Sequence, residues 1–298
     1  MEQYTRLCNR ILKDGEWFEV GRNGAKALTV ISDRFEYDCT DNKIEIPTTA
    51  FTKTDMAIAE LLGYIRGETN SKRFEELGTP TWNANANKTT AWLNSPYRIG
   101  ENHMGQVYGA VGNNWPKLRS EDGATAHIGV YQVEDEGIDL IEKIYNDLRN
   151  GIDDRGEIWT FWNPGMFQFG CLRPCLHSHH FSLLNGNLYL DSTQRSVDAP
   201  LGLKFNMVQV QVLLRLMAQI TGHKAKSAAH NMVNCHIYEN QVDIMRGQME
   251  REDKPQTATL WINPEIKTLE DVRTWVTTDD FRIEGYDPHP FVKYPFTE

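Results

Sequence analysis

The stretch FSLLNGNLYL, residues 181–190, decides the fold that the sequence predicts. Asn185-Gly186 lies between two short apolar runs, and Asn-Gly in that setting is a strong signal for a two-residue β-hairpin turn. Residues 181–190 are therefore predicted to form two antiparallel strands. Outward from the turn, Cys175 follows a proline ahead of the first strand, and Arg195 follows the second. The hairpin would let these two side chains meet.

A cysteine acts as a nucleophile when nearby positive charge stabilises its thiolate. Arg195 is the candidate source of that charge for Cys175. A buried cysteine that only fills space is the commoner alternative, and spacing alone does not separate the two.

Three histidines, His177, His179 and His180, follow Cys175. Period-two alternation along a strand predicts that His177 and His179 share one face. Imidazole is a common metal ligand, but no carboxylate or further cysteine stands at suggestive spacing. No metal is predicted, and a strand with polar residues facing a wet cleft is the other interpretation.

Composition is that of an ordinary soluble protein, with 40% apolar and 24% charged residues in a chain of 298. The net charge of −10 argues against a broad footprint on nucleic acid or an anionic membrane, although a few arginines suffice for a small anion. No run approaches the roughly 20 apolar residues of a membrane span. The N-terminus lacks a signal-peptide pattern, and five cysteines at irregular spacing are poor evidence for disulfides. We expect a cytoplasmic protein, in the host cytoplasm if it is viral.

Local patterns predict the remaining elements. Residues 54–67, 136–149 and 207–221 are predicted helices, the last capped by Asn206, and residues 157–169 are aromatic-rich and β-like. Glu60 lies on the first helix, where it would either face water or, in a cleft, act as a tuned acid or base. Arg22 lies between glycines in a strand–loop–strand pattern, either near a phosphate or exposed on a plain turn. We see no repeat or linker, so residues 1–298 are predicted to be one domain.

A set of separate motifs then resembles one known family, the thymidylate synthases. The motifs fall in the family's order: Pro174-Cys175, Gln194-Arg195-Ser196-x-Asp198, Leu201-Gly202-x-x-Phe205-Asn206, His236-x-Tyr238 and Tyr286-x-Pro288-His289-Pro290. The resemblance implies an α/β (α+β) fold with helices covering a bent, mixed β-sheet, and a homodimer packed sheet to sheet. It also implies a small-molecule nucleotide as substrate and 5,10-methylenetetrahydrofolate as co-substrate.

The resemblance further implies a role for each matching residue. Cys175 would add to C6 of the pyrimidine ring, and Arg195 would favour its thiolate. The phosphate would be held by Arg22, Arg195 and Ser196, with Arg155 supplied by the partner subunit, and Gln194 would also bind the substrate. His236 and Tyr238 would bind the sugar hydroxyl, Asn206 the pyrimidine edge, Glu60 the proton transfer at O4, and Tyr108 the C5 proton. Trp82, Leu172, Asp198, Gly202 and Phe205 would shape the folate side, with Asp198 also counted as catalytic.

Three departures from the family pattern lie near these motifs. Leu176 stands where the family has histidine, Gly156 where it has a second arginine, and Met232-Val233-Asn234 where it has Gly-Gly-Asp. They suggest an altered last step in which water replaces hydride and gives 5-hydroxymethyl-dUMP, as in viruses with modified DNA. Thymidylate synthesis from dUMP is the first alternative, hydroxymethylation of dCMP or CMP the second, and a non-catalytic nucleotide-binding homologue the third. Asn206 favours uracil over cytosine, because an amide can pair with both N3–H and O4.

Overall fold

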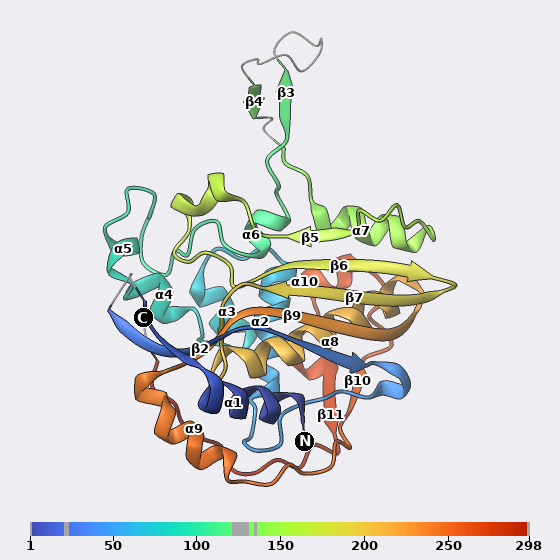
Figure 1. The fold of residues 1–298 in the computed structure, drawn as a ribbon. Coiled ribbons are helices and arrows are strands. Elements are labelled where there is room, and N and C mark those ends of the chain that lie inside the picture. Colours follow the sequence, from blue (N-terminus) through green and yellow to red (C-terminus); the bar gives the residue numbers. More distant parts are fainter. Residues whose placement is uncertain (1, 21–23, 121–130, 134–135, 297–298) are drawn as a thin grey trace.

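The computed structural model describes residues 2–20, 24–120, 131–133 and 136–296 (Figure 1). Its helices are α1 (Gln3–Asp14), α2 (Thr54–Ile65), α3 (Ser71–Leu77), α4 (Asn83–Asn87), α5 (Thr90–Leu93), α6 (Gly109–Gly112), α7 (Leu140–Arg149), α8 (Gly202–Thr221), α9 (Val242–Met249) and α10 (Leu269–Thr274). Its strands are β1 (Glu16–Val20), β2 (Ala25–Asp38), β3 (Leu118–Ser120), β4 (Tyr131–Val133), β5 (Ile158–Thr160), β6 (Leu176–Leu184), β7 (Asn187–Gln194), β8 (Val197–Asp198), β9 (Lys224–Tyr238), β10 (Thr259–Ile262) and β11 (Phe281–Glu284).

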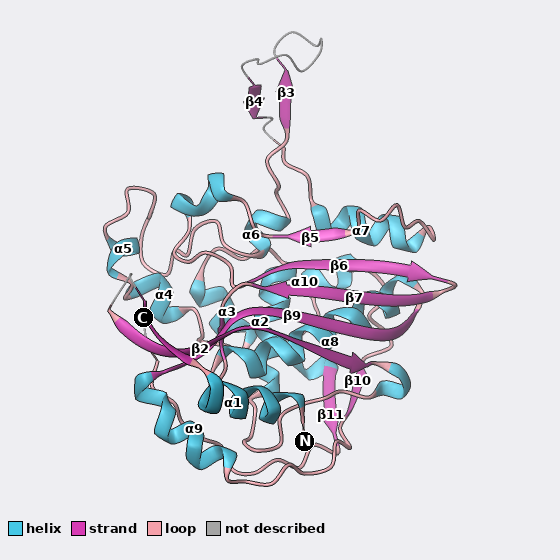
Figure 2. Cartoon of the chain, viewed as in Figure 1, coloured by secondary structure: helices cyan, strands magenta, loops and turns pink. Residues whose placement is uncertain are grey.

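A bent, mixed sheet crosses the molecule, with helices around it (Figure 2). Its order is β1-β2-β9-β7-β6-β5, and β8 pairs with β9. The β7–β9 and β8–β9 pairs are parallel, and the other neighbours are antiparallel. Helix α8 packs on β9 and β7, and α2 packs on α8, so one apolar core lies between the sheet and these helices. The predicted fold class is confirmed.

The predicted hairpin is present and longer than its signal, because β6 and β7 extend the pairing to Leu176 and Gln194. Asn185 and Gly186 have φ of 51° and 74°, the positive values that the two-residue turn requires. The open end of the hairpin brings Cys175 and Arg195 together, and the Arg195 backbone N–H donates to the Cys175 carbonyl at 2.9 Å. The prediction that these residues meet across the hairpin is confirmed.

Helix α8 begins earlier than predicted. It starts at Gly202, so Asn206 lies inside the helix, and its prediction as the helix cap is wrong. The Asn206 side chain bonds to Gln194 and Gln209 instead of a free backbone N–H. The helix ends at Thr221, the predicted last residue, and Gly222 follows it with φ of 79° in the left-handed region.

Helix α2 is a core helix, since every residue from Ala57 to Ile65 is buried. It begins at Thr54, and the residue before it, Lys53, makes no side-chain capping bond. Helix α7 starts at Leu140 and not at residue 136, because Asp139 caps it and Ile138 pairs with Trp115 instead. The segment 157–169 is a strand only over β5, and a 3-10 turn occupies Pro164–Phe169.

Two small sheets lie outside the main one, β10–β11 and the β3–β4 hairpin that projects from the body in Figure 1. Within the described ranges, no helix combines the length and apolar character needed to cross a bilayer.

Candidate active site

Cys175 lies directly before β6 and is half-buried. Its backbone N–H donates to the Tyr108 hydroxyl at 3.0 Å, while its carbonyl accepts from Arg195. The cysteine backbone is therefore held from two sides, by the residue predicted to supply charge and by the residue predicted to handle the C5 proton.

The Arg195 guanidinium is fixed on the loop that carries the cysteine. Nε donates to the Pro174 carbonyl at 2.9 Å, and Nη2 donates to the Arg173 carbonyl at 3.0 Å. The guanidinium also lies over the Trp162 ring, 5.2 Å from its centroid. Because an arginine remains ionised in proteins, these bonds place a permanent positive charge next to the cysteine loop.

Tyr108 occupies a strained and closely packed position. Its φ of 47° is unusual for a bulky residue, and such strain often marks functional sites. Its ring stacks on Tyr64 with centroids 4.5 Å apart and meets Trp82 edge-on at 5.5 Å. Burial raises the pKa of Tyr108 well above its ordinary value, and Cys175 raises it further. The hydroxyl therefore stays protonated near neutral pH.

Glu60 is buried, with 9% of its surface exposed. Its two oxygens accept hydrogen bonds from the Thr81 hydroxyl at 2.8 Å and from Gln209 Nε2 at 2.7 Å. Burial raises the pKa of Glu60, and the bonds from Thr81 and Gln209 lower it. A buried carboxyl with a raised pKa suits the proton-transfer role predicted for it.

Asn206 joins Glu60 to the sheet through a chain of amides. Asn206 Nδ2 donates to Gln209 Oε1 at 2.9 Å, and Gln194 Nε2 donates to Asn206 Oδ1 at 3.0 Å. Gln194 Oε1 is 2.8 Å from His230 Nε2. Burial lowers the pKa of His230 to about 3, so this imidazole is neutral. The chain runs from α2 through α8 to β7 and β9.

The two residues predicted to bind the sugar lie on β9, near Asp198 of β8. Asp198 pairs with His236 in the β8–β9 register. His236 Nδ1 is 2.8 Å from the Asn234 carbonyl, which assigns the proton to Nδ1, and its ring is 5.0 Å from that of Tyr238. Burial raises the pKa of Asp198, and His236 opposes that change. Asp198 Oδ1 accepts the Leu201 N–H at 3.0 Å, just ahead of α8.

The other predicted binding residues lie around the same elements. Trp82 packs on Tyr108, and Gly202 and Phe205 precede Asn206 on α8. Leu172 is half-buried three residues before Cys175, and the Ser196 carbonyl accepts from Gln194 at 3.0 Å.

One predicted phosphate ligand, Arg155, is not brought to the site of its own chain. Arg155 is exposed in a turn with φ of 70°, where its N–H donates to Asp153. Asp153 in turn accepts the Leu183 N–H, which puts Arg155 near the turn end of the β6–β7 hairpin and away from Cys175. Arg22 lies outside the described residues.

The histidine cluster does not share one environment. A register shift between Leu176 and Ser178 interrupts the alternation on which the shared face of His177 and His179 was predicted. His177 lies against Trp162, whereas His179 is buried and bonded to Ser192 at 2.8 Å. In the described part of the chain, no group of three His, Cys, Asp or Glu residues is placed to hold a metal.

Sequence reasoning missed several residues of this site. Trp162 supports Arg195, Thr81 bonds Glu60, and His230 and Gln209 extend the amide chain. Only Gln209 carried a signal, because it lies three residues after Asn206 on a helix, the spacing that puts two side chains next to each other.

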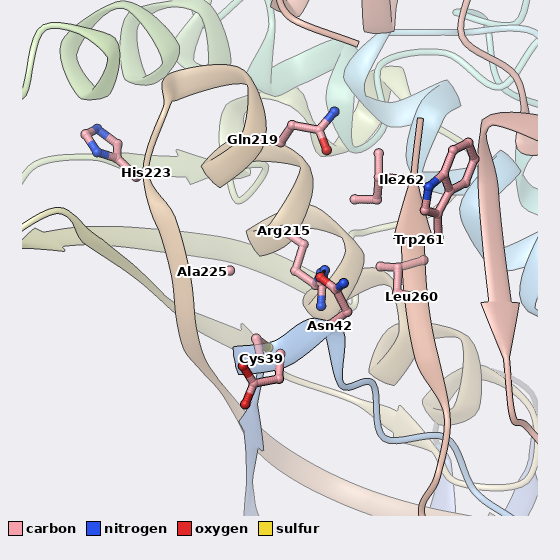
Figure 3. Close-up of a pocket in the computed structure, with 10 residues that line it drawn as sticks. Cys39, Asn42, Arg215, Gln219, His223, Ala225, Leu260, Trp261 and Ile262 are labelled. Carbon is pink, nitrogen blue, oxygen red and sulfur yellow. Dashed lines mark hydrogen bonds between the residues drawn. The ribbon is translucent and has the colours of Figure 1, made fainter. Parts of the chain in front are cut away.

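A separate cavity of about 280 Å³ lies between the C-terminal half of α8 and β10 (Figure 3). Arg215, Gln219 and Trp261 line it, together with Asn42, which accepts a hydrogen bond from Arg215. It contains none of the residues predicted to act on the nucleotide or the folate.

Comparison with known proteins identifies the class to which this fold and site belong. The family model described as thymidylate synthase matches residues 2–298. Similar proteins named thymidylate synthase occur in Vibrio atlanticus (strain LGP32), 54% identical over 297 residues, and Marinomonas sp. (strain MWYL1), 53% over 298. Another, from Glaesserella parasuis serovar 5 (strain SH0165), is 52% identical over 297 residues. Each comparison covers 100% of both chains. The chain belongs to the thymidylate synthase family.

Membership confirms several predictions. The family consists of transferase enzymes that bind a nucleotide and use methylenetetrahydrofolate as co-substrate. It also overturns the prediction that water completes the reaction to give 5-hydroxymethyl-dUMP, because the full-length relatives are named thymidylate synthase. The same relatives come from bacteria and give no support to the viral interpretation.

Two of the residues behind that error have a structural explanation. Leu176 and Met232 are only 4% and 1% exposed and belong to the hydrophobic core. Their apolar character is explained by packing, and gives no evidence for an added water. Gly156 lies in the exposed turn with Arg155, away from Cys175.

Proposed function

We propose that this chain is a thymidylate synthase that converts dUMP to dTMP with 5,10-methylenetetrahydrofolate. The observation that carries the proposal is the convergence on one place of Cys175, the fixed charge of Arg195 and the Glu60–Gln209–Asn206 chain. Full-length identity of 52–54% to proteins of that name supports the same reaction.

Cys175 is the nucleophile that adds to C6 of the pyrimidine, and this addition makes C5 reactive toward the one-carbon unit. Arg195 favours the thiolate through its charge and also binds the phosphate with Ser196. Gln194 acts on the substrate through Asn206, to which its amide donates. The folate supplies the one-carbon unit and the hydride. Tyr108 stands beside the cysteine backbone at 3.0 Å, where its hydroxyl can orient by hydrogen bonding a water molecule that accepts the C5 proton.

Asn206 pairs with the pyrimidine edge, and Glu60 organises proton transfer at O4. The raised pKa of Glu60 supports this role, because burial makes the carboxylate a better proton acceptor than an exposed one. His236 and Tyr238 bind the sugar hydroxyl. Trp82, Leu172, Asp198, Gly202 and Phe205 line the folate side.

We further propose a homodimer that packs sheet to sheet and completes each site with Arg155 of the partner subunit. The position of Arg155 near the far end of the hairpin supports supply across an interface, since it cannot serve the Cys175 of its own chain from there. The proposal includes Arg22 as a phosphate ligand, a single catalytic domain and a cytoplasmic location.

The test is to incubate the protein with dUMP and methylenetetrahydrofolate and to follow both products. We expect dTMP and dihydrofolate in equal amounts, because the hydride comes from the folate. Cys175→Ala should lower turnover by at least about 10³-fold, as loss of a covalent nucleophile does in other enzymes, with unchanged thermal unfolding as the folding control. Nucleotide product without dihydrofolate, or turnover that survives in Cys175→Ala, would contradict the proposal.

A further inference from the structure

Gln209 is a buried glutamine whose side chain contacts Asn206, the residue predicted to bind the pyrimidine edge. It is 2% exposed and lies one helical turn after Asn206 on α8. One end of its side chain contacts α2, and the other end contacts Asn206. A buried glutamine must have partners for both ends, so its orientation is decided by what those partners can accept or donate.

The partners of Gln209 allow one orientation. Nε2 donates to the Ala57 carbonyl at 3.2 Å and to the Glu60 carboxyl at 2.7 Å. The backbone carbonyl can only accept, and so does an ionised carboxylate. Nε2 must therefore face α2, which leaves Oε1 toward Asn206. Asn206 has to present Nδ2 to that oxygen, as it does at 2.9 Å.

Gln194 favours the same orientation of the Asn206 amide from its oxygen side. Gln194 Nε2 donates to the Ser196 carbonyl at 3.0 Å, another group that can only accept, and to Asn206 Oδ1 at 3.0 Å. Reversing the Asn206 amide would bring its oxygen against Gln209 Oε1 and its NH₂ group against Gln194 Nε2. Neither glutamine can reverse to relieve this without losing its backbone acceptor, so the reversed amide carries two unsatisfied contacts.

This orientation matches one pyrimidine. An amide has two donor hydrogens and two acceptor lone pairs, so these bonds leave Asn206 one of each for a ligand. Its oxygen can accept N3–H, and its NH₂ group can donate to O4, which is the pattern of uracil. Cytosine presents an acceptor at N3 and a donor at the amino group, and it needs the reversed amide.

We infer that Gln209 determines base specificity by locking the Asn206 amide in the orientation that accepts uracil and rejects cytosine. The inference rests on the proposed function for its substrate. It assigns Gln209 a positioning role that acts through Asn206 and does not require Gln209 to touch the nucleotide.

The first test compares kcat/KM for dUMP and dCMP in the wild type and in Gln209→Leu. We expect the dUMP value to fall about 10- to 100-fold and the dUMP/dCMP ratio to fall at least about tenfold, as expected when a buried polar contact is left unpaired. Gln211→Leu is the matched control, because Gln211 is a buried glutamine on the same helix. Among the described residues, Gln211 bonds to the backbone of Glu45 and Met207 and to no side chain. This control should lower stability and leave the ratio unchanged.

A double-mutant cycle separates positioning from general structural support. In an Asn206→Ala background, Gln209→Leu should leave the dUMP/dCMP ratio unchanged, because its effect passes through the missing amide. Calorimetric binding of dUMP and dCMP to the same variants gives the ratio without turnover. If Gln209→Leu does not fold, the unbranched Gln209→Met removes the same bonds at similar volume.

The outcomes distinguish the inference from the function on which it rests. The inference is overturned if a folded Gln209 variant keeps the wild-type dUMP/dCMP ratio. It is also overturned if Gln209→Leu lowers that ratio equally in the Asn206→Ala background. A wild type that makes no dTMP from dUMP overturns the proposed function, and the binding ratios then still decide whether Gln209 sets base preference.

Discussion

Lys204 shows at the residue scale what burial does to a charge beside the proposed folate site. It is 5% exposed, and its ammonium lies 5.6 Å from the Tyr294 ring. Burial lowers its pKa from 10.5 to about 8, while Cys8 and Asp198 oppose the change. A lowered lysine pKa means that the folded state disfavours the proton, so the protonated side chain destabilises the fold.

The sign of the pH dependence follows from the two pKa values. Below pH 8 both states hold the proton and the folded state carries the full cost, which the shift from 10.5 to about 8 puts at roughly 3 kcal/mol. Between pH 8 and 10.5 the unfolded state binds more protons, so stability rises with pH. Lys204→Met should therefore be the more stable protein at pH 7, by about 1–3 kcal/mol, with the advantage shrinking toward pH 10.

Chemical unfolding at several pH values measures this difference. Exposed Lys88 offers the control, since Lys88→Met should show no pH-dependent change relative to the wild type. A Lys204→Met advantage that is constant from pH 7 to pH 10 would mean that the charge of Lys204 is not what destabilises the fold.

Residue-scale prediction from sequence succeeded where the signal was local. Asn185-Gly186 specifies its own turn, and the turn alone brings Cys175 next to Arg195. Asn206 was predicted to lie just before α8, but it lies inside that helix. Its side-chain oxygen accepts a hydrogen bond from Gln194 on β7 and so does not cap the helix. A contact between elements leaves no trace in local spacing, which is also why the role of Gln209 was not predicted.

At the element scale, replacing either of two helix glycines by alanine should change the free energy of unfolding, in opposite directions. Gly222 ends α8 with φ of 79°, and Gly247 lies within α9; a Cβ at either position would meet no atom within 4 Å. Packing therefore does not contribute to the change in stability when either glycine is replaced by alanine, and backbone conformation alone decides its sign. Gly222→Ala should lower the free energy of unfolding by about 1 kcal/mol, because alanine disfavours the left-handed region. Gly247→Ala should raise it by about 0.5–1 kcal/mol through helix propensity.

Urea unfolding of both variants at one protein concentration checks the pair. Equal changes of the same sign would show that the left-handed end of α8 is not retained in solution. The comparison bears on function as well, because α8 carries both Asn206 and Gln209 and its position on β9 sets where they point.

At the scale of the whole molecule, the sequence predicted the fold class and the family correctly but not the last step of the reaction. The motifs that carried the family are spread from Pro174 to Pro290, so local substitutions could not obscure them. The final step was argued in part from Leu176 and Met232, both of which pack in the core. A residue that departs from a pattern near a site can be explained by packing, and sequence alone does not tell this from a change in chemistry.

The sheet also has a face that suits a second subunit. Ile31 of β2 is 67% exposed and Val233 of β9 is 38% exposed, and β2 and β9 are neighbouring strands. Arg34 on β2 pairs with Asp191 on β7 at 3.2 Å, so exposed apolar and charged side chains are mixed there. Such a surface fits the proposed sheet-to-sheet dimer, in which Arg155 would reach the partner's phosphate site.

Mixing two inactive variants tests that arrangement. Arg155→Ala should have low activity alone because it lacks a phosphate ligand. Cys175→Ala should have low activity alone because it lacks the nucleophile. If Arg155 acts across the interface, each mixed dimer has one site with both substitutions and one site with neither. Random reassociation then makes half of the dimers mixed and should restore about a quarter of the wild-type sites. If Arg155 serves its own chain, every site in the mixture keeps one substitution, and activity should stay at the average of the two variants.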